Sequence, residues 1–410
     1  MKKGSRCEVP PAVIIIRGSS ALIPLCGMPL LKRTLFTLRS IGGQDVFILT
    51  GQQMGVLRET FGDGSDLGLC IRLVATDEAS HLDTLPQGRL LVLEGNCIWD
   101  ERILRMLSQV EGAAAVIDSE SESPYVGAAK FESECEVLSP LPDARWPEQW
   151  LQTAGEETVT VIDIARLETH ESEVRRALKP YWFCIQSDDD AQQAKSHLIE
   201  RAQKGTLDWW AWYVNRPIEN WLLRYVADWP VTPNQLSVVS NVAAYGLALI
   251  WATGHLWPWA LLAVMVSVID GLDGKVARVK GLASKLGTLE HSFDVLWEQA
   301  WYLALAWAGY TMQGSVTPLV LGLVVLLLDT FNRHIHMQFR QTTGASLSEY
   351  SEFDRAFRWI DGRRNTYLPY ILIGAALGKP SLSLAAIVAH AGLTAMVYSI
   401  QAIRHLSKIR

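Results

Sequence analysis

The stretch D-G-L-D-G-K-V-A-R at residues 270–278, followed after eight residues by G-T-L-E-H-S-F-D at 287–294, decides how the second half of this chain folds. The two aspartates of the first stretch are three residues apart, and the glutamate and aspartate of the second are four apart. On a helix, either spacing places both carboxylates on one face. Apolar residues 263–269 lead into the first pair, and residues 295–310 follow the second. The pattern predicts two long apolar helices, each with a pair of acids at one end.

Asp270, Asp273, Glu290 and Asp294 together suit divalent cations. Acids at a membrane boundary are costly unless they are paired or bound to metal, so they are functional candidates. Four carboxylates on two adjacent helices make an all-oxygen site for Mg²⁺ or Mn²⁺. Two such ions clamp a diphosphate and stabilise the charge that develops on it. We therefore expect these four acids to hold two ions.

Small residues and an arginine follow the first acid pair. Gly274 and Ala277 leave room for a bulky ligand to lie directly against the helix. Arg278 suits phosphate oxygens, which a guanidinium binds in bidentate fashion. The alternative is a polar loop that merely joins two membrane helices. We favour the functional interpretation because loops rarely combine two acid pairs, small residues and an arginine at helical spacing.

These residues resemble the CDP-alcohol phosphotransferase family, whose signature is D-x-x-D-G-x-x-A-R, eight residues, then G-x-x-x-D-x-x-x-D. Glu290 departs from it, because it stands where the third aspartate belongs and one residue early. The side chain of glutamate is one methylene longer than that of aspartate, which would compensate for a backbone position slightly farther from the metal. The matching residues are Asp270, Asp273, Gly274, Ala277, Arg278, Gly287 and Asp294.

The resemblance implies a membrane enzyme that moves a phosphoalcohol group from a CDP-alcohol to an acceptor alcohol and releases CMP. It implies that the first three acids hold metals, and that Asp294 takes the proton of the acceptor hydroxyl and also touches a metal. A T-P-N sequence resembles the border of the family's nucleotide pocket, which makes Asn234 a candidate cytidine contact beside Gly274, Ala277 and Arg278. The resemblance also implies a homodimer.

Composition divides the 410 residues into two unlike halves, which leaves room for two or more domains. Apolar segments and tryptophan concentrate in the second half, although the mean hydropathy of the whole chain is only +0.12. The net charge of -6 argues against nucleic acid as a partner. The cysteines fit no zinc pattern, and we expect reduced thiols in a cytosolic domain. They are Cys7, Cys26, Cys70, Cys97, Cys135 and Cys184.

Residues 1–185 are predicted to form a three-layer α/β domain with a mostly parallel sheet, because apolar runs alternate with helical patterns. The first run is too short for a signal peptide and predicts a buried strand. A helix is expected over 29–38. The expected strands are residues 12–16, 45–50, 70–75, 89–93 and 113–118.

Two stretches of this half resemble a sugar-nucleotide-type nucleotidyltransferase with a cytidylyltransferase-like fold. They are P-A-V-I-I-I-R-G-S-S-A-L-I-P-L-C-G-M-P-L-L and L-V-L-E-G-N-C-I-W-D. Ala21 stands about where the family has an arginine, and Asn96 where it has a metal-binding aspartate. Because asparagine is a poor replacement for a Mg²⁺ carboxylate, we expect a retained fold without nucleotidyl transfer.

Residues 186–230 are predicted to hold a linker and a helix on the membrane surface. After a polar, helix-prone stretch comes W-W-A-W-Y-V-N-R-P-I-E-N-W-L-L-R-Y. This segment is too charged to span a bilayer, and its aromatic residues favour an amphipathic helix in the headgroup region. The alternative is a soluble packing helix.

Residues 231–410 are predicted to form a polytopic membrane domain of six transmembrane helices, most of them about 20 residues long. Lysine and arginine concentrate between the second and third spans, between the fourth and fifth, and in the tail. Basic loops stay cytoplasmic, so both termini and the acid cluster are expected on the cytoplasmic side of the inner membrane. The expected spans are residues 235–254, 257–276, 287–310, 315–335, 366–379 and 382–403.

The segment between the fourth and fifth spans is predicted to contain a cytoplasmic helix and a candidate site for an acceptor phosphate. Arg340, Arg363 and Arg364 are the candidates, because arginine binds phosphate oxygens in bidentate fashion. The alternative is that these arginines only anchor the topology. Asp329 at the end of the fourth span is expected to serve polar packing.

Two other functions remain open. A nucleotidyltransferase anchored to the membrane would need the phosphate loop and metal aspartate that the first half lacks. A membrane protein that has lost catalysis would explain the departure at Glu290. The sequence does not identify the donor and acceptor alcohols. L-E-H-S-F-D resembles the amino-alcohol branch of the family, whereas the fused first domain favours the inositol-phosphate branch.

Overall fold

The computed structural model describes most of the chain as two compact units, residues 1–201 with 279–281 and residues 202–278 with 282–410. Side chains at 147, 152–154 and 287–291 are outside the description. The described residues are 9–51, 53–76, 85–121, 124–132, 146–154, 159–171, 174–282 and 287–409.

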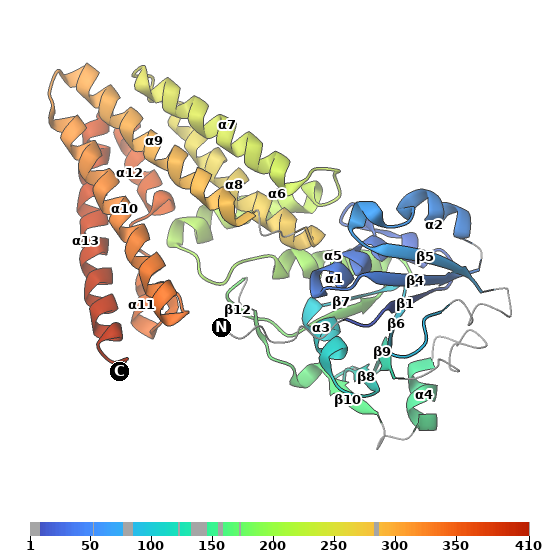
Figure 1. The fold of residues 1–410 in the computed structure, drawn as a ribbon. Coiled ribbons are helices and arrows are strands. Elements are labelled where there is room, and N and C mark those ends of the chain that lie inside the picture. Colours follow the sequence, from blue (N-terminus) through green and yellow to red (C-terminus); the bar gives the residue numbers. More distant parts are fainter. Residues whose placement is uncertain are drawn as a thin grey trace. The chain divides into compact units, whose positions relative to one another are not determined.

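Within the described residues of the first unit, a seven-stranded sheet has the order β10-β8-β9-β6-β1-β4-β5 (Figure 1). Neighbouring strands are parallel except at β9, which runs antiparallel to β6 and to β8. The prediction of a mostly parallel sheet is confirmed. The strands are β1 (Ala12–Ile16), β4 (Asp45–Thr50), β5 (Cys70–Ala75), β6 (Leu90–Glu94), β8 (Ala114–Ile117), β9 (Tyr125–Phe131) and β10 (Thr160–Asp163).

Both faces of this sheet are buried, which explains why β1 is apolar at every position. Ile14 packs with the cluster that includes α1 and α3 side chains, whereas Val13 and Ile15 pack with Trp146 of α4 on the other face. Alternation along a strand sends successive side chains to opposite faces. The three-layer prediction is therefore confirmed. The helices of this unit are α1 (Leu30–Ile41), α2 (Met54–Phe61), α3 (Glu101–Gln109), α4 (Trp146–Ala154) and α5 (Asp188–Arg201).

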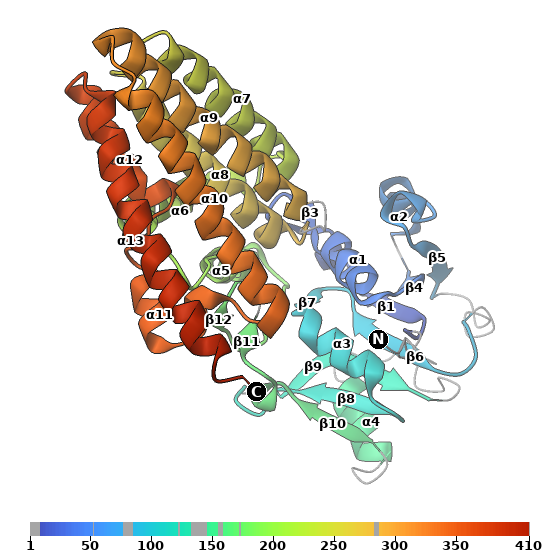
Figure 2. The same cartoon turned by 60° about the vertical axis from the view of Figure 1, so that its left-hand side comes forward.

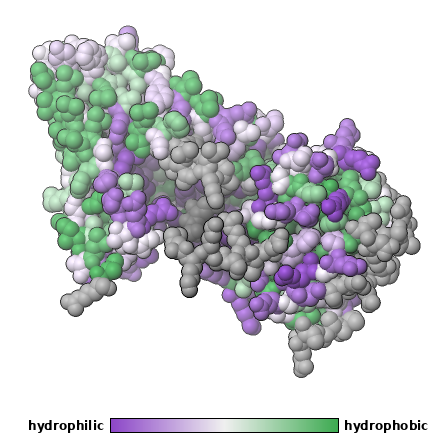
Figure 3. Space-filling view, in the orientation of Figure 1, coloured by the Kyte–Doolittle hydropathy of each residue, from purple (hydrophilic) through white to green (hydrophobic). Residues whose placement is uncertain are grey.

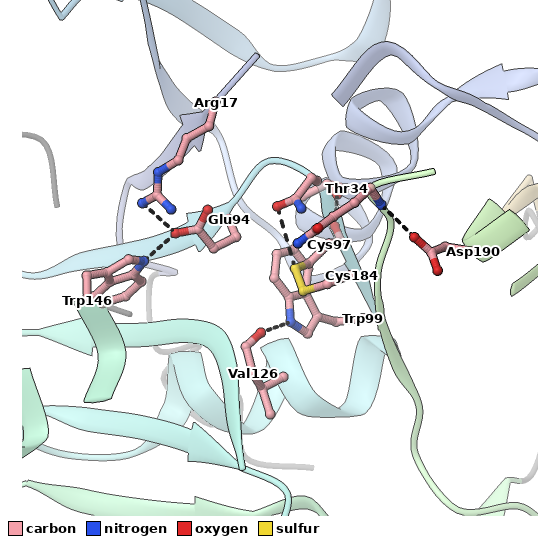
Figure 4. Close-up of a disulfide and its surroundings, with 11 residues drawn as sticks. Arg17, Thr34, Glu94, Cys97, Trp99, Val126, Trp146, Cys184 and Asp190 are labelled. Atoms are coloured by element: carbon pink, nitrogen blue, oxygen red, sulfur yellow. Dashed lines mark hydrogen bonds and ion pairs between the residues drawn. A yellow bond between two sulfur atoms is a disulfide. The ribbon is translucent and has the colours of Figure 1, made fainter. Parts of the chain in front are cut away.

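Short strand pairs complete the first unit, and one of them corrects the prediction for the cysteines. β7 (Cys97–Trp99) pairs antiparallel with β13 (Trp182–Cys184), which places Cys97 opposite Cys184 with their Cα atoms 4.1 Å apart. The two form a disulfide (Figure 4), so the expectation of reduced thiols was wrong for this pair. Cys26 and Cys70 remain reduced, and Cys7 and Cys135 lie outside the described residues. The other pairs are β2 (Pro24–Leu25) with β3 (Met28–Pro29), and β11 (His170–Glu171) with β12 (Arg176–Ala177).

The second unit is helical throughout its described elements. A π-helical turn, Ala211–Asn215, leads into α6 (Arg216–Val226). The long helices α7, α9, α10 and α13 pack each against the next, and α12 packs on α13 (Figures 1 and 2). The sequence predicted a helix at each of α7, α8, α9, α10, α12 and α13, and a further helix in the segment that holds α11. The helices are α7 (Pro233–Ala252), α8 (Ala260–Lys280), α9 (Gly287–Gln313), α10 (Thr317–Thr343), α11 (Glu352–Phe357), α12 (Arg364–Ala376) and α13 (Pro380–Leu406).

Among the described residues, α7, α10 and α13 are long and apolar enough to cross a membrane. Apolar side chains cover much of the visible face of the helical unit (Figure 3). Leu249, Leu327 and Ile403 on these helices are each about 70% exposed, as suits contact with lipid rather than water. The described residues of α8, α9 and α12 do not qualify in the same way. Helices α8 and α9 carry the acid pairs, and α12 has only 13 residues.

Candidate active site

The two aspartates of α8 reach different neighbouring helices. Asp273 is buried and accepts a hydrogen bond from Ser237 Oγ of α7 at 2.8 Å. Asp270, half-buried, accepts a hydrogen bond from Arg364 Nη2 of α12 at 2.6 Å. The spacing of three residues therefore connects α8 to two other helices of the bundle through its acids.

Arg364 is the centre of a buried group of charges that sequence reasoning only partly anticipated. Its Nη1 lies 3.3 Å from Glu298 of α9, and its guanidinium lies 4.9 Å from the centre of the Trp297 ring. Glu298 also pairs with Arg333 of α10. Arg333 in turn donates to Asp329 at 2.8 Å, which confirms Asp329 as a polar packing residue. Glu298 was missed, although it lies four residues after the last motif aspartate and so on the same helix face.

Asp294 belongs to the same surroundings. It is buried on α9, one turn before Glu298, and the positive charge of Arg364 acts on it as well as on Asp270 and Glu298. Asp270 and Glu298, from two helices, therefore contact one guanidinium, and Asp294 lies within its electrostatic range. Since burying negative charges together is costly without a cation, this arrangement requires positive charge.

The described side chains do not by themselves complete a metal site. Among them, no three His, Cys, Asp or Glu groups lie close enough together to hold an ion. Glu290 lies on α9, but its side chain is outside the described residues. The donor chemistry nevertheless fits a divalent cation, because the acids are all carboxylates, whose oxygens are the ligands that Mg²⁺ prefers.

The small residues of the motif lie beside Arg278. A Cβ added to Gly274 would first meet Arg278 Nη1, at 3.3 Å, so this guanidinium lies over the bare backbone. Arg278 Nε also donates to the carbonyl of Ala202 at 2.8 Å. Ala277 is half-buried on the same helix. Asn234 is exposed on the first turn of α7, three residues before the serine that bonds Asp273.

The first turn of α7 has the predicted start signal. Thr232 Oγ1 accepts from the backbone N–H of Gln235 at 3.3 Å, and the Gln235 side chain accepts from the Thr232 N–H at 3.0 Å. This capping box, with Pro233 at the first helical position, fixes where the helix begins. It thereby fixes the place of Asn234.

The candidate arginines for an acceptor phosphate lie in different surroundings. Arg363 Nε donates to the buried Asp361 at 2.7 Å, and Arg358 donates to the same carboxylate at 3.0 Å. Burial would raise the pKa of Asp361, but Arg363 and Arg358 lower it to about 2. Arg363 therefore has a structural partner, Arg364 faces the acids, and Arg340 is exposed near the end of α10.

Helix α6 contacts α8 through buried polar groups. Lys275 Nζ lies 2.9 Å from Glu219 and donates to Asn220 at 2.6 Å. Burial raises the pKa of Glu219, against the opposing effect of Lys275. Five large aromatic side chains of this segment are exposed, and its place on the membrane surface stays a prediction. They are Trp212, Tyr213, Trp221, Tyr225 and Trp229.

Comparison with known proteins identifies the helical region. Residues 230–398 match the family model of CDP-alcohol phosphatidyltransferase. The match covers 169 of the 410 residues. The matched range contains every predicted site residue, from Asn234 to Asp294. The family predicted from the acid motif is therefore confirmed for the helical half.

Three relatives illustrate the similarity. Over 79 residues the chain is 40% identical to a phosphatidylinositol phosphate synthase of Corynebacterium glutamicum, covering 19% of this chain and 36% of that one. Over 128 residues it is 31% identical to a bifunctional IPC transferase and DIPP synthase of Aquifex aeolicus, covering 31% and 29%. Both matches span about a third of the relative's length. A protein of the same name from Rubrobacter xylanophilus is 22% identical over 411 residues, covering 89% of this chain and 88% of that one.

The first unit places a buried acid close to its two altered motifs. Ala21 is buried in the turn after β1, and Asn96 is half-buried after β6. Glu94, the last residue of β6, pairs with Arg17 at 2.9 Å and accepts a hydrogen bond from Trp146 Nε1. Figure 4 shows the side chains of Arg17 and Trp146 pointing toward it. Neither Ala21 nor Asn96 supplies a charged side chain to these motifs.

Proposed function

We propose that this chain is an integral membrane CDP-alcohol phosphotransferase. It moves a phosphoalcohol or phosphatidyl group from a CDP-alcohol to an acceptor alcohol and releases CMP. The observation that carries the proposal is the match of residues 230–398 to the family model, a range that contains the buried Asp273 and Asp294 and the half-buried Asp270. Carboxylate oxygens are the ligands that Mg²⁺ prefers, and two such ions stabilise the charge that develops when a diphosphate bond is broken.

Two divalent ions, Mg²⁺ or Mn²⁺, are held by Asp270, Asp273, Glu290 and Asp294. When bound, the ions supply Lewis-acid stabilisation of the charge that develops on the diphosphate. Arg364 pairs with Asp270 and Glu298, so an ion that binds Asp270 competes with this arginine. The longer side chain of Glu290 takes the role of the family's third aspartate.

The chain's own residues carry out the remaining steps. Asp294 accepts the proton of the acceptor hydroxyl, and the resulting oxygen attacks the phosphorus that bears the alcohol. A new P–O bond forms, the bond to the CMP oxygen breaks, and CMP leaves with that electron pair. Arg278 binds phosphate oxygens across the bare face of Gly274 and Ala277, and Asn234 contacts the cytidine.

The enzyme sits in the inner membrane with six spans, both termini cytoplasmic, as a homodimer. Helices α7, α10 and α13 support the spans, since they are long and apolar enough to cross. Helices α8 and α9 would cross with their acid-bearing ends at the cytoplasmic surface, where CDP-linked donors are found. The aromatic side of α6 lies in the headgroup region.

The names of the relatives favour the inositol branch of the family. One is a phosphatidylinositol phosphate synthase and two are IPC transferases and DIPP synthases. We therefore propose an inositol or inositol phosphate group on the donor or acceptor. The first unit keeps a nucleotidyltransferase-like fold without nucleotidyl transfer, because Ala21 and Asn96 lack the charges that chemistry uses.

Exchange of labelled CMP into CDP-alcohols by membranes that contain the chain tests this function. We expect exchange that needs Mg²⁺ or Mn²⁺, and its loss in Asp294→Asn at unchanged expression. No exchange with CDP-diacylglycerol, CDP-inositol, CDP-glycerol or CDP-choline would contradict the proposal. Release of pyrophosphate from CTP by Asp294→Asn would instead support an anchored nucleotidyltransferase.

A further inference from the structure

The acid motif contains a second set of residues that faces α6 rather than the acids. Ser267, Gly271 and Lys275 follow each other at intervals of four along α8. Residues four apart on a helix lie on one face. Each of the three contacts the segment that begins with the π-helical turn and continues as α6, so the contacts form a continuous stripe along α8.

The contacts are specific and buried. Asn215 Nδ2 donates to Ser267 Oγ at 3.0 Å, and Lys275 pairs with Glu219 at 2.9 Å. All four side chains are less than 10% exposed. Asn215 and Glu219 are themselves four residues apart, so the facing stripe also follows one helix face. A buried ion pair of this kind fixes geometry, because either charge left alone would be strongly disfavoured.

Gly271 explains how closely α6 approaches the motif. A Cβ on this residue would collide with the Glu219 carboxylate, whose Cδ would lie 2.8 Å away. Gly271 directly follows Asp270 and precedes Asp273 by two residues. The bare backbone at this position therefore lets a carboxylate from another helix lie against the segment of α8 that carries both acids.

We infer that α6 sets the rotation of α8 about its axis, and thereby the position of the metal-binding carboxylates. Glu219 is a positioning residue that acts through Lys275 and the Gly271 surface, while Asn215 fixes the preceding turn. With α8 held on this side, Asp270 reaches α12 and Asp273 reaches α7. The inference rests on the proposed function, since it assigns to α6 control of that site's affinity for metal.

Mn²⁺ binding to the full-length protein in detergent, followed by the paramagnetic resonance of free Mn²⁺, tests the inference. Gly271→Ala should weaken Mn²⁺ binding by about tenfold, as changes in residues that support metal ligands do. Glu219→Asp shortens the side chain that the new methyl would meet and keeps its charge. The double variant Gly271→Ala/Glu219→Asp should therefore regain most of the affinity, which a general loss of packing would not allow.

Gly246→Ala is the matched control, because a Cβ at that glycine of α7 would meet nothing within 4 Å. It should bind Mn²⁺ as the wild type does. Wild-type affinity in Gly271→Ala, or no recovery in the double variant, would overturn the inference and leave the proposed function standing. A wild-type protein that binds no Mn²⁺ would overturn both.

Discussion

Replacing Arg364 with glutamine should tighten metal binding while leaving the helical fold in place. Arg364 donates to Asp270 at 2.6 Å in a pair whose side chains are 16% and 14% exposed. A hydrogen bond between charged groups contributes about 1.5–3 kcal/mol. A metal ion that binds Asp270 has to compete with this bond, so removing it should lower the Kd for Mn²⁺ by about 10- to 100-fold, at 1.4 kcal/mol per factor of ten.

The fold should tolerate the change because Glu298 keeps its ion pair with Arg333. The assay is titration of the full-length protein in lipid nanodiscs with Mn²⁺, followed by calorimetry. Arg340→Gln, which removes an exposed arginine from the same half of the protein, is the control and should leave the Kd unchanged. Unchanged or weaker Mn²⁺ binding in Arg364→Gln would refute the competition for Asp270.

Three further substitutions test the structure outside the acids. Burial raises the pKa of Glu94 despite the opposing effect of Arg17. The contribution of Glu94 to stability is therefore present below the ordinary pKa of 4.5 and is lost as pH rises through the raised pKa. Glu94→Gln should make the free energy of unfolding of the first unit, measured with denaturant, depend less on pH between pH 4 and 7, and an unchanged dependence would contradict this. The pKa of Asp361 is about 2, below its ordinary value of 3.8. Ionised Asp361 therefore contributes about 2.5 kcal/mol to stability above pH 3.8, and this contribution is lost as pH falls toward 2. Asp361→Asn should lower the free energy of unfolding at pH 7 by about that amount, whereas no change would show that the ion pairs of Asp361 do not stabilise the fold. A Cβ on Gly322 would lie 2.5 Å from a side chain of α9, so Gly322→Ala should destabilise the fold by about 1–3 kcal/mol and lower the melting temperature in detergent. Gly392→Ala is the control and should leave the melting temperature unchanged, because a Cβ there has its nearest neighbour at 3.9 Å. Equal melting temperatures for the two variants would refute the close packing at Gly322.

Apolar runs in the sequence predicted the regular elements well. β1, β4 and β5 begin and end at the predicted residues, because each is a short and mostly apolar run. The long helices of the second unit were predicted because their apolar stretches are much longer than a strand. These patterns did not predict β9 (Tyr125–Phe131) at all, and its antiparallel pairing depends on the path of the chain between strands.

Contacts between distant residues account for what sequence reasoning missed. Cys97 and Cys184 are 87 residues apart, and only the pairing of β7 with β13 brings them together. Arg364 is 94 residues from Asp270, and its basic turn was predicted as a phosphate site without its acidic partners. Glu219 was assigned to a surface helix, yet its side chain is buried against the motif.

The acid motif could be predicted from the sequence because the spacing of residues along one helix shows which of them share a face without any knowledge of tertiary contacts. Asp270 and Asp294 were predicted to share one environment, and both now lie within range of the same guanidinium. The number of membrane spans was less readable. Helix α12 is shorter than a bilayer requires by itself, since about 20 residues are needed, so its prediction as a span depends on the topology of its neighbours.

The most direct test of the central claim is a crystal structure of the full-length protein with Mn²⁺ and a CDP-alcohol, in which anomalous scattering locates the ions. The account predicts two Mn²⁺ ions bound by the carboxylates of Asp270, Asp273, Glu290 and Asp294, with the diphosphate against Gly274 and Arg278. Ions bound elsewhere, with these carboxylates facing away from one another, would contradict it.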